Sequence, residues 1–137
     1  MSTVNLNAKN FSETVKNNDI VVLDWWASWC GPCRAFAPIY EKASAEHSDI
    51  VFGKINTEEE LDLSAAFGIQ SIPTLMIFRE EIILFSEAGM MSAKQLGELL
   101  GRVRSLDMQD VRRRIAEAAK AESSKKAVPQ RTALNEA

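Results

Sequence analysis

Two kinds of hydrophobic pattern alternate along roughly the first hundred residues. Phe11 and Val15 stand four residues apart, which places them on one face of a helix that Asn7 can cap. Residues 20–27 (IVVLDWWA) then form a β-branched and aromatic run without polar alternation. Such a run is typical of a strand that is covered on both faces. The pattern therefore predicts a helix followed by a central, buried strand.

The rest of this region continues with helical and strand patterns. The predicted elements are a helix over 31–47, a strand over 50–55, a helix over 58–67, strands over 74–78 and 82–86, and a helix over 92–103. Helices separate the early strands, whereas two strands follow each other directly near the end. This order predicts the α/β class with a mixed sheet.

The pattern changes beyond Leu106, where aromatic residues stop and alanine and charged residues dominate. Asp107 can cap a helix there. A thin apolar stripe follows it, at Met108, Val111, Ile115 and Ala118 or Ala119. Beyond Ser123 the composition is typical of disorder. We therefore predict one globular domain over residues 1–104 and a basic extension over 105–137, helical first and disordered afterwards.

Charge divides the chain in the same way. The net charge of the 137 residues is −3, which argues against a dedicated nucleic-acid binder. Residues 1–101 hold 7 basic and 14 acidic residues, and residues 102–137 hold 9 and 5. The basic extension could dock to an acidic partner, mediate self-association, contact anionic lipid, or form a helix with no partner. The sequence leaves these alternatives open.

The chain shows no membrane or export signal. No apolar run reaches the ~20 residues of a membrane helix, and the first residues are polar without a basic start. We therefore expect a cytoplasmic protein without a transmembrane segment.

The only two cysteines, Cys30 and Cys33, are the strongest candidates for chemistry. A bridge between them would close too short a loop to stabilise the fold much. A zinc site would need two more ligands, and the chain has one histidine, His47, so we expect no metal. Two sulfurs at a helix start lie about one turn apart and can form a disulfide. The helix N-terminus favours the thiolate of Cys30, which predicts Cys30 as the more exposed nucleophile and Cys33 as the resolving cysteine.

The residues around this pair resemble the thioredoxin family. Residues 24–33 (DWWASWCGPC) are similar to its active-site signature, and residues 68–75 (GIQSIPTL) to its second signature. Residues 37–38, residues 53–56 and Gly89 also match its pattern. The resemblance covers roughly residues 3–104. It implies a thioredoxin fold, with a central five-stranded mixed sheet flanked by four helices.

The resemblance also implies roles for residues around the cysteines. Asp24 matches a buried carboxylate that accepts the proton of Cys33, and Lys54 matches a lysine that pairs with it. Pro73 matches a cis-proline that faces the disulfide. The remaining matches imply a substrate groove formed by Trp29, Gly31, Pro32, Ile72, Gly89 and Met90. In that groove the backbone of Ile72 would pair with an extended substrate.

The implied function is reduction of protein disulfides. It needs no bound cofactor besides the redox-active disulfide, and a flavoprotein thioredoxin reductase would supply electrons. An oxidant or isomerase of the same fold usually carries histidine between the cysteines, so Gly31-Pro32 favours the reductase. A non-catalytic binding module is a third alternative, against which the intact cysteine pair argues.

Two surface segments carry further expectations. Arg79-Glu80-Glu81 follows the fourth strand without a glycine, which predicts a wider turn or a bulge. The acidic run of residues 58–60 is interpreted as the solvated first turn of a helix.

Overall fold

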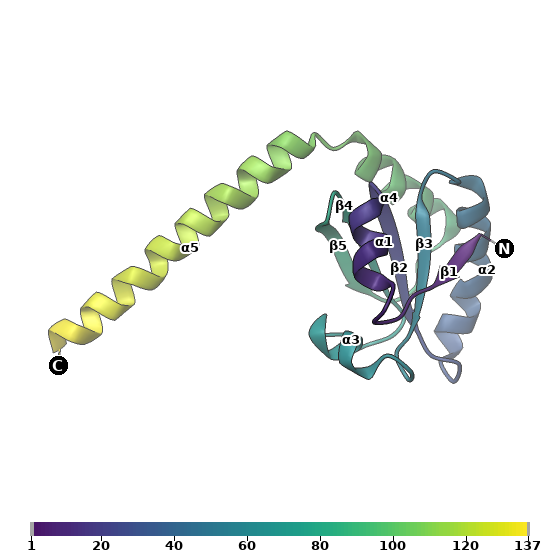
Figure 1. The fold of residues 1–137 in the computed structure, drawn as a ribbon, viewed down its shortest axis with the longest axis horizontal. Coiled ribbons are helices and arrows are strands. Elements are labelled where there is room, and N and C mark those ends of the chain that lie inside the picture. Colours follow the sequence, from purple (N-terminus) through teal and green to yellow (C-terminus); the bar gives the residue numbers. More distant parts are fainter. Residues whose placement is uncertain (1, 137) are drawn as a thin grey trace. The chain divides into compact units, whose positions relative to one another are not determined.

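The computed structural model describes residues 2–136, with side chains through Ser123. The chain divides into two compact units, residues 1–103 and 104–137. The first unit is built on a five-stranded sheet in the order β1-β3-β2-β4-β5 (Figure 1). Strand β2 is parallel to β3 and antiparallel to β4, which confirms a mixed sheet.

The elements of this sheet and its helices largely follow the predicted order. The strands are β1 (Thr3–Asn5), β2 (Ile20–Trp26), β3 (Val51–Asn56), β4 (Thr74–Arg79) and β5 (Ile82–Ala88). The helices are α1 (Phe11–Asn17), α2 (Gly31–Glu46), α3 (Leu61–Ala66) and α4 (Ala93–Ser105). Three residues are too few to show a hydrophobic pattern, so β1 was not predicted from it. Its parallel pairing with β3 defines it as a strand.

Side-chain alternation along β2 divides the core into two layers. Val22 faces a cluster that includes residues of α2 and α4. Val21 and Leu23 face the opposite cluster, to which α1 contributes and against which Leu63 of α3 packs. Strand β2 is therefore buried on both faces, as its unbroken hydrophobic run predicts.

Helix α1 begins later than its predicted cap. It starts at Phe11, and the side-chain oxygen of Asn7 accepts hydrogen bonds from the backbone N–H groups of Lys9 and Asn10, at 2.9 and 3.1 Å. Asn7 therefore caps the turn that leads into the helix rather than the helix itself.

The start of α3 also differs from the prediction. Residues 58–60 lie in a turn or directly after it, because Asn56 accepts the backbone N–H groups of Glu58, Glu59 and Glu60. The acidic side chains are not simply solvated. Glu60 accepts the backbone N–H of Ala8 at 3.1 Å, which ties this turn to the segment before α1.

The sequence predicted either a wider turn or a bulge in the β4–β5 hairpin, and the structure has the bulge. Arg79 pairs with Ile82, so the turn is Glu80-Glu81 alone, and a wider turn is wrong. Both turn residues have positive φ, 52° and 68°. The expected bulge is present as a register shift between Ile77 and Phe78. The tight turn is held from outside, since the backbone N–H of Glu80 donates to the carbonyl of Asp19 at 2.8 Å.

The second unit contains helix α5 (Met108–Glu136). Asp107 caps it, since its side chain accepts the backbone N–H groups of Gln109 and Asp110 at 3.0 and 3.3 Å. The backbone of α5 continues as helix to Glu136, past Ser123, where the composition is typical of disorder. The low hydrophobicity of these residues argues against a packed core. A helix does not need one to form its backbone hydrogen bonds, because these bonds join residues close in sequence. Alanine and lysine each occur twice in residues 124–136 and are good helix formers, whereas Pro129 in the same stretch is not.

Candidate functional site

The two cysteines lie where β2 passes into α2. They form a disulfide, with Cα atoms 5.2 Å apart. Cys30 is the N-cap residue of α2, and Pro32 lies in the first turn, where its missing N–H costs no helical hydrogen bond. The backbone N–H of Cys33 points to the sulfur of Cys30 at 3.2 Å. The helix N-terminus thus presents a hydrogen-bond donor to this sulfur, which favours negative charge on it.

Exposure does not distinguish the two cysteines in this oxidised structure. Cys30 is 4% exposed and Cys33 is 3% exposed, so the predicted difference between them is absent. The chemical difference lies in the helix geometry, since Cys30 alone receives the N–H of its partner.

A second segment, before β4, meets the disulfide. The sulfur of Cys30 lies 3.8 Å from the carbonyl oxygen of Ile72. The Ile72–Pro73 peptide bond is cis, which confirms the prediction. A third segment joins them, because the backbone N–H of Gly89 donates to the carbonyl of Pro73 at 2.7 Å. The fold therefore brings together residues from three distant parts of the sequence.

Asp24 lies in the buried strand β2 and is 1% exposed. Strand alternation places it on the same face as Val22, the face covered by α2. Burial raises the pKa of this carboxyl from 3.8 to about 7, and the charge of Lys54 partly opposes that rise. Neither carboxylate oxygen has a hydrogen-bond partner among the described residues. A buried carboxyl without partners is poised to exchange a proton near neutral pH.

Lys54 lies beside Asp24, in register across the parallel β2–β3 pair. Its ammonium nitrogen lies 4.9 Å from the centre of the Trp26 ring rather than in a hydrogen bond with Asp24. The implied pairing is therefore a longer-range attraction, which acts on the pKa of Asp24 without a direct contact.

Trp29 forms an exposed platform next to the disulfide, with 65% of its surface accessible. Its indole N–H donates to the carboxylate of Glu58, in the turn before α3. Arg34 reaches back from α2 to the carbonyl of Ser28, at 2.8 Å. Sequence reasoning missed both Glu58 and Arg34, since neither contact follows a helix or strand period. The acidic run at residues 58–60 was the only signal.

The other predicted groove residues lie at the ends of the same segments. Gly31 opens α2, and Met90 follows β5 with 44% of its surface exposed. Trp25 is fully buried and packs on Phe67 at 5.7 Å between ring centres. Trp25 is therefore a core residue and not part of the exposed site.

Neither a metal-binding cluster nor a membrane-spanning helix is found among the described residues. They contain no group of three or more histidine, cysteine, aspartate or glutamate residues that could hold a metal ion. Within the same part of the chain, no helix has both the length and the apolarity needed to cross a membrane.

Comparison with known families and curated proteins gives consistent matches. The thioredoxin family model matches residues 2–102. A thioredoxin-named protein of Streptomyces coelicolor is 49% identical over 116 residues, which cover 85% of this chain and 87% of the relative. That alignment is longer than the family match, so it includes part of the extension. Thioredoxin C-3 of Corynebacterium nephridii is 36% identical over 110 residues, 80% of this chain and 68% of the relative.

Solved structures give the same picture. A mutant thioredoxin from Halobacterium salinarum superposes with a TM-score of 0.70 at 27% identity, over 77% of this chain and 92% of its own. A Plasmodium falciparum thioredoxin superposes with a TM-score of 0.67 at 26% identity, over 73% and 97%.

Proposed function

Because this chain belongs to the thioredoxin family and is a thiol–disulfide oxidoreductase, we propose that it reduces disulfides of client proteins, with Cys30 as nucleophile and Cys33 as resolving cysteine. One observation carries the assignment of roles. Cys30 caps the N-terminus of α2, and the N–H of Cys33 points to its sulfur. A thiolate is therefore stabilised at Cys30.

The reaction is two successive thiol–disulfide exchanges. The Cys30 thiolate attacks one sulfur of the client disulfide, forms a mixed disulfide and releases the other client sulfur as a thiolate. The Cys33 thiolate then attacks the Cys30 sulfur and releases the second client sulfur. Two electrons have passed to the client, and the Cys30–Cys33 disulfide of the present structure is the oxidised product.

Asp24 supplies a proton acceptor for the second exchange. Cys33 must lose its proton before it can attack, and a carboxyl with a pKa of about 7 can take that proton near neutral pH. Lys54 tunes this acid, because its positive charge favours the ionised carboxylate.

The client would lie across the segments that meet at the disulfide. The exposed indole of Trp29 and the thioether of Met90 offer apolar contacts, and Gly31, Pro32 and Gly89 leave room for a client backbone. The backbone of Ile72 would pair with an extended client segment, and Pro73 would hold that segment opposite Cys30.

Electrons must return to the disulfide after each turnover. We assign that step to a flavoprotein thioredoxin reductase, so this chain needs no bound cofactor of its own. We assign the cycle to the cytoplasm, where the thiol pool is kept reduced.

Trapping the mixed disulfide tests the assignment of roles. A Cys33→Ser variant should accumulate a covalent complex with a disulfide-bonded client such as insulin, because the second exchange is blocked. The matched Cys30→Ser variant should form little complex. The measurement is non-reducing electrophoresis followed by mass spectrometry of the linked peptides. A complex formed through Cys33 in preference to Cys30 would reverse the assignment.

Turnover tests the reductase direction separately. The unsubstituted protein should reduce insulin repeatedly when thioredoxin reductase and NADPH are present, and a Cys30→Ser,Cys33→Ser variant should not. Client binding that survives in the double variant without any reduction by the parent protein would favour a binding module instead.

A further inference from the structure

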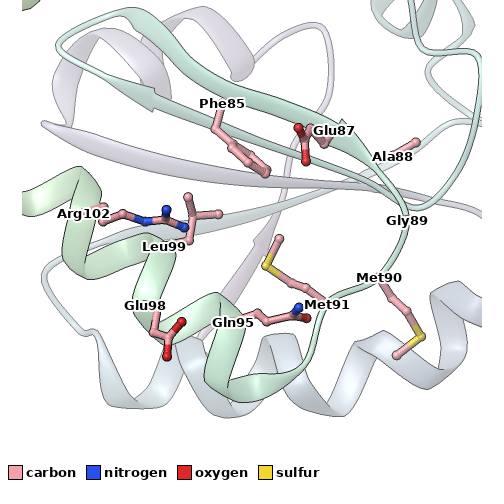
Figure 2. Close-up of a pocket in the computed structure, with 10 residues that line it drawn as sticks. All are labelled: Phe85, Glu87, Ala88, Gly89, Met90, Met91, Gln95, Glu98, Leu99 and Arg102. Carbon is pink, nitrogen blue, oxygen red and sulfur yellow. The ribbon is translucent and has the colours of Figure 1, made fainter.

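A cavity of about 400 Å³ lies between β5 and α4, beside the proposed client groove (Figure 2). Gly89 and Met90 line it and also belong to that groove. The hydrogen bond from Gly89 to Pro73 fixes this end of the cavity next to the segment that faces Cys30. A client that lies across the disulfide therefore passes the mouth of the cavity.

The inner part of the cavity is apolar. Figure 2 shows that the Phe85 side chain points from β5 across the cavity, toward Met91 and Leu99. Leu99 is only 8% exposed, whereas Met90 at the groove end is 44% exposed. Methionine side chains adapt to the shape of a guest, so this lining can accept a flexible aliphatic chain.

The lining of the cavity also carries two carboxylates and one guanidinium. Glu87 lies on the β5 wall, and Glu98 and Arg102 lie on α4 (Figure 2). Neither glutamate side chain has a hydrogen-bond or ion-pair partner among the described residues. The lining therefore holds one more carboxylate than cationic groups, and residues 1–101 as a whole also carry an excess of acidic residues.

We propose that this cavity is a second client subsite that takes a lysine or arginine side chain close to the client's disulfide. The proposal rests on the client-reducing function proposed above. The aliphatic stem of such a side chain would pack against Phe85, Met91 and Leu99. Its cationic end would then lie among the charged groups of the lining, where two carboxylates outnumber one guanidinium. The positive charge of Arg102 repels such a side chain and so limits the preference for lysine or arginine.

Peptide substrates can test this preference directly. Each peptide carries one disulfide and a single lysine at a chosen position on either side of a cysteine, and a matched peptide carries glutamine there. We expect one lysine position at which kcat/KM exceeds that of the glutamine peptide by about three- to fivefold, the size of an exposed ion pair. A third peptide with glutamate at that position should be reduced more slowly than either.

Three variants locate the effect in the cavity. The Glu87→Gln,Glu98→Gln variant should lose the lysine advantage through a higher KM, with reduction of the glutamine peptide unchanged. Arg102→Gln should increase the lysine advantage by about twofold. Glu13→Gln removes one negative charge from α1, which packs on the opposite face of the sheet, and should leave the advantage intact.

The possible results separate this proposal from the function on which it rests. Equal rates for lysine and glutamine peptides at every position would overturn the subsite while leaving the reductase function in place. A preference for glutamate, or a lysine advantage that persists in Glu87→Gln,Glu98→Gln, would overturn it as well. Failure to reduce any peptide would reject the proposed function and the subsite together.

Discussion

Asp24 carries a titratable carboxyl in a strand that is covered on both faces, where an ionised group is poorly solvated. Its pKa of about 7 lies far above the ordinary 3.8, chiefly because of burial. The folded protein therefore keeps a proton that the unfolded chain releases between these pH values. Stability must fall as pH rises through this interval, because the unfolded state then binds fewer protons.

Replacing Asp24 by asparagine should remove this pH dependence. Relative to the parent protein, Asp24→Asn should gain stability progressively above pH 4 and level off above about pH 7. The full gain is at most about 4 kcal/mol, the equivalent of the pKa difference. Urea unfolding of the oxidised proteins from pH 4 to 9 measures it. A stability difference independent of pH would contradict the raised pKa.

The same variant should be a slower enzyme, because asparagine cannot accept the Cys33 proton. We expect the second exchange near pH 7 to slow by up to about 100-fold, with formation of the mixed disulfide much less affected. Rapid-mixing kinetics with a disulfide peptide can separate the two steps. Equal slowing of both steps would indicate a structural role for Asp24 instead.

At the scale of elements, the β4–β5 turn has a backbone conformation that glutamate residues rarely adopt. Glu80 and Glu81 both have positive φ, a conformation that glycine adopts with least strain. The pairing of Arg79 with Ile82 requires this two-residue turn. The hydrogen bond from Glu80 to Asp19 adds support from the segment before β2.

Glycine at the second turn position should relieve this strain. Glu81, with φ 68°, has an exposed side chain, and we expect Glu81→Gly to stabilise the protein by about 1 kcal/mol. Urea unfolding at pH 7 measures the change. Glu81→Ala is the control, because it removes the carboxylate but keeps the Cβ atom, and it should leave stability nearly unchanged. Lower stability of the glycine variant would contradict strain at this position.

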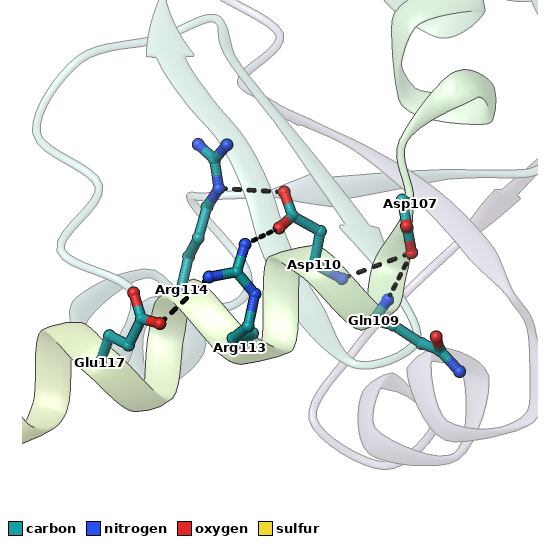
Figure 3. Close-up of polar contacts among 6 residues, drawn as sticks. All are labelled: Asp107, Gln109, Asp110, Arg113, Arg114 and Glu117. Carbon is teal, nitrogen blue, oxygen red and sulfur yellow. Dashed lines mark hydrogen bonds and ion pairs between the residues drawn. The ribbon is translucent and has the colours of Figure 1, made fainter.

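Helix α5 is supported by contacts along its own surface (Figure 3). Asp110 pairs with Arg113 and with Arg114, the latter at 3.0 Å, and Arg113 also contacts Glu117 at 3.1 Å. The hydrogen bond from Arg113 lowers the pKa of Asp110 below its usual value. Arg113 and Arg114 are thus paired within the helix. This pairing reduces the positive charge that α5 could offer to an acidic partner.

At the scale of the whole molecule, every residue assigned to chemistry lies in the first unit. Both core clusters lie between Leu6 and Val103. We propose that residues 1–104 form the catalytic domain and that the extension over 105–137 serves partners, as a contact for an acidic protein or for a second copy of the chain.

Removing the extension should therefore spare catalysis. A chain that ends at Arg104, one residue before the end of α4, should fold and reduce insulin at the parent rate. Loss of stability should stay within about 1–2 kcal/mol, since the core clusters stay complete. Thermal unfolding and the insulin assay measure both quantities, and size-exclusion chromatography reports any change in association. An insoluble or inactive truncated protein with intact cysteines would reject this division of the chain.

Local chemistry in the sequence was sufficient for much of this structure. Periodicity located the central strand and the main helices, because helix and strand periods are written in consecutive residues. The CxxC spacing at a helix start indicated a reactive pair, since that geometry is also local. The extension was recognisable because its composition lacks residues that could build a core.

The tertiary structure alone decided the features that depend on distant contacts. Strand β1 exists because β3 pairs with it, and the contact of Trp29 with Glu58 joins loops 29 residues apart. The tight Glu80-Glu81 turn is held by Asp19, far away in sequence. The pKa of Asp24 depends on its burial by distant segments and on the charge of Lys54. Such properties follow from packing between segments, which residue periodicity does not encode.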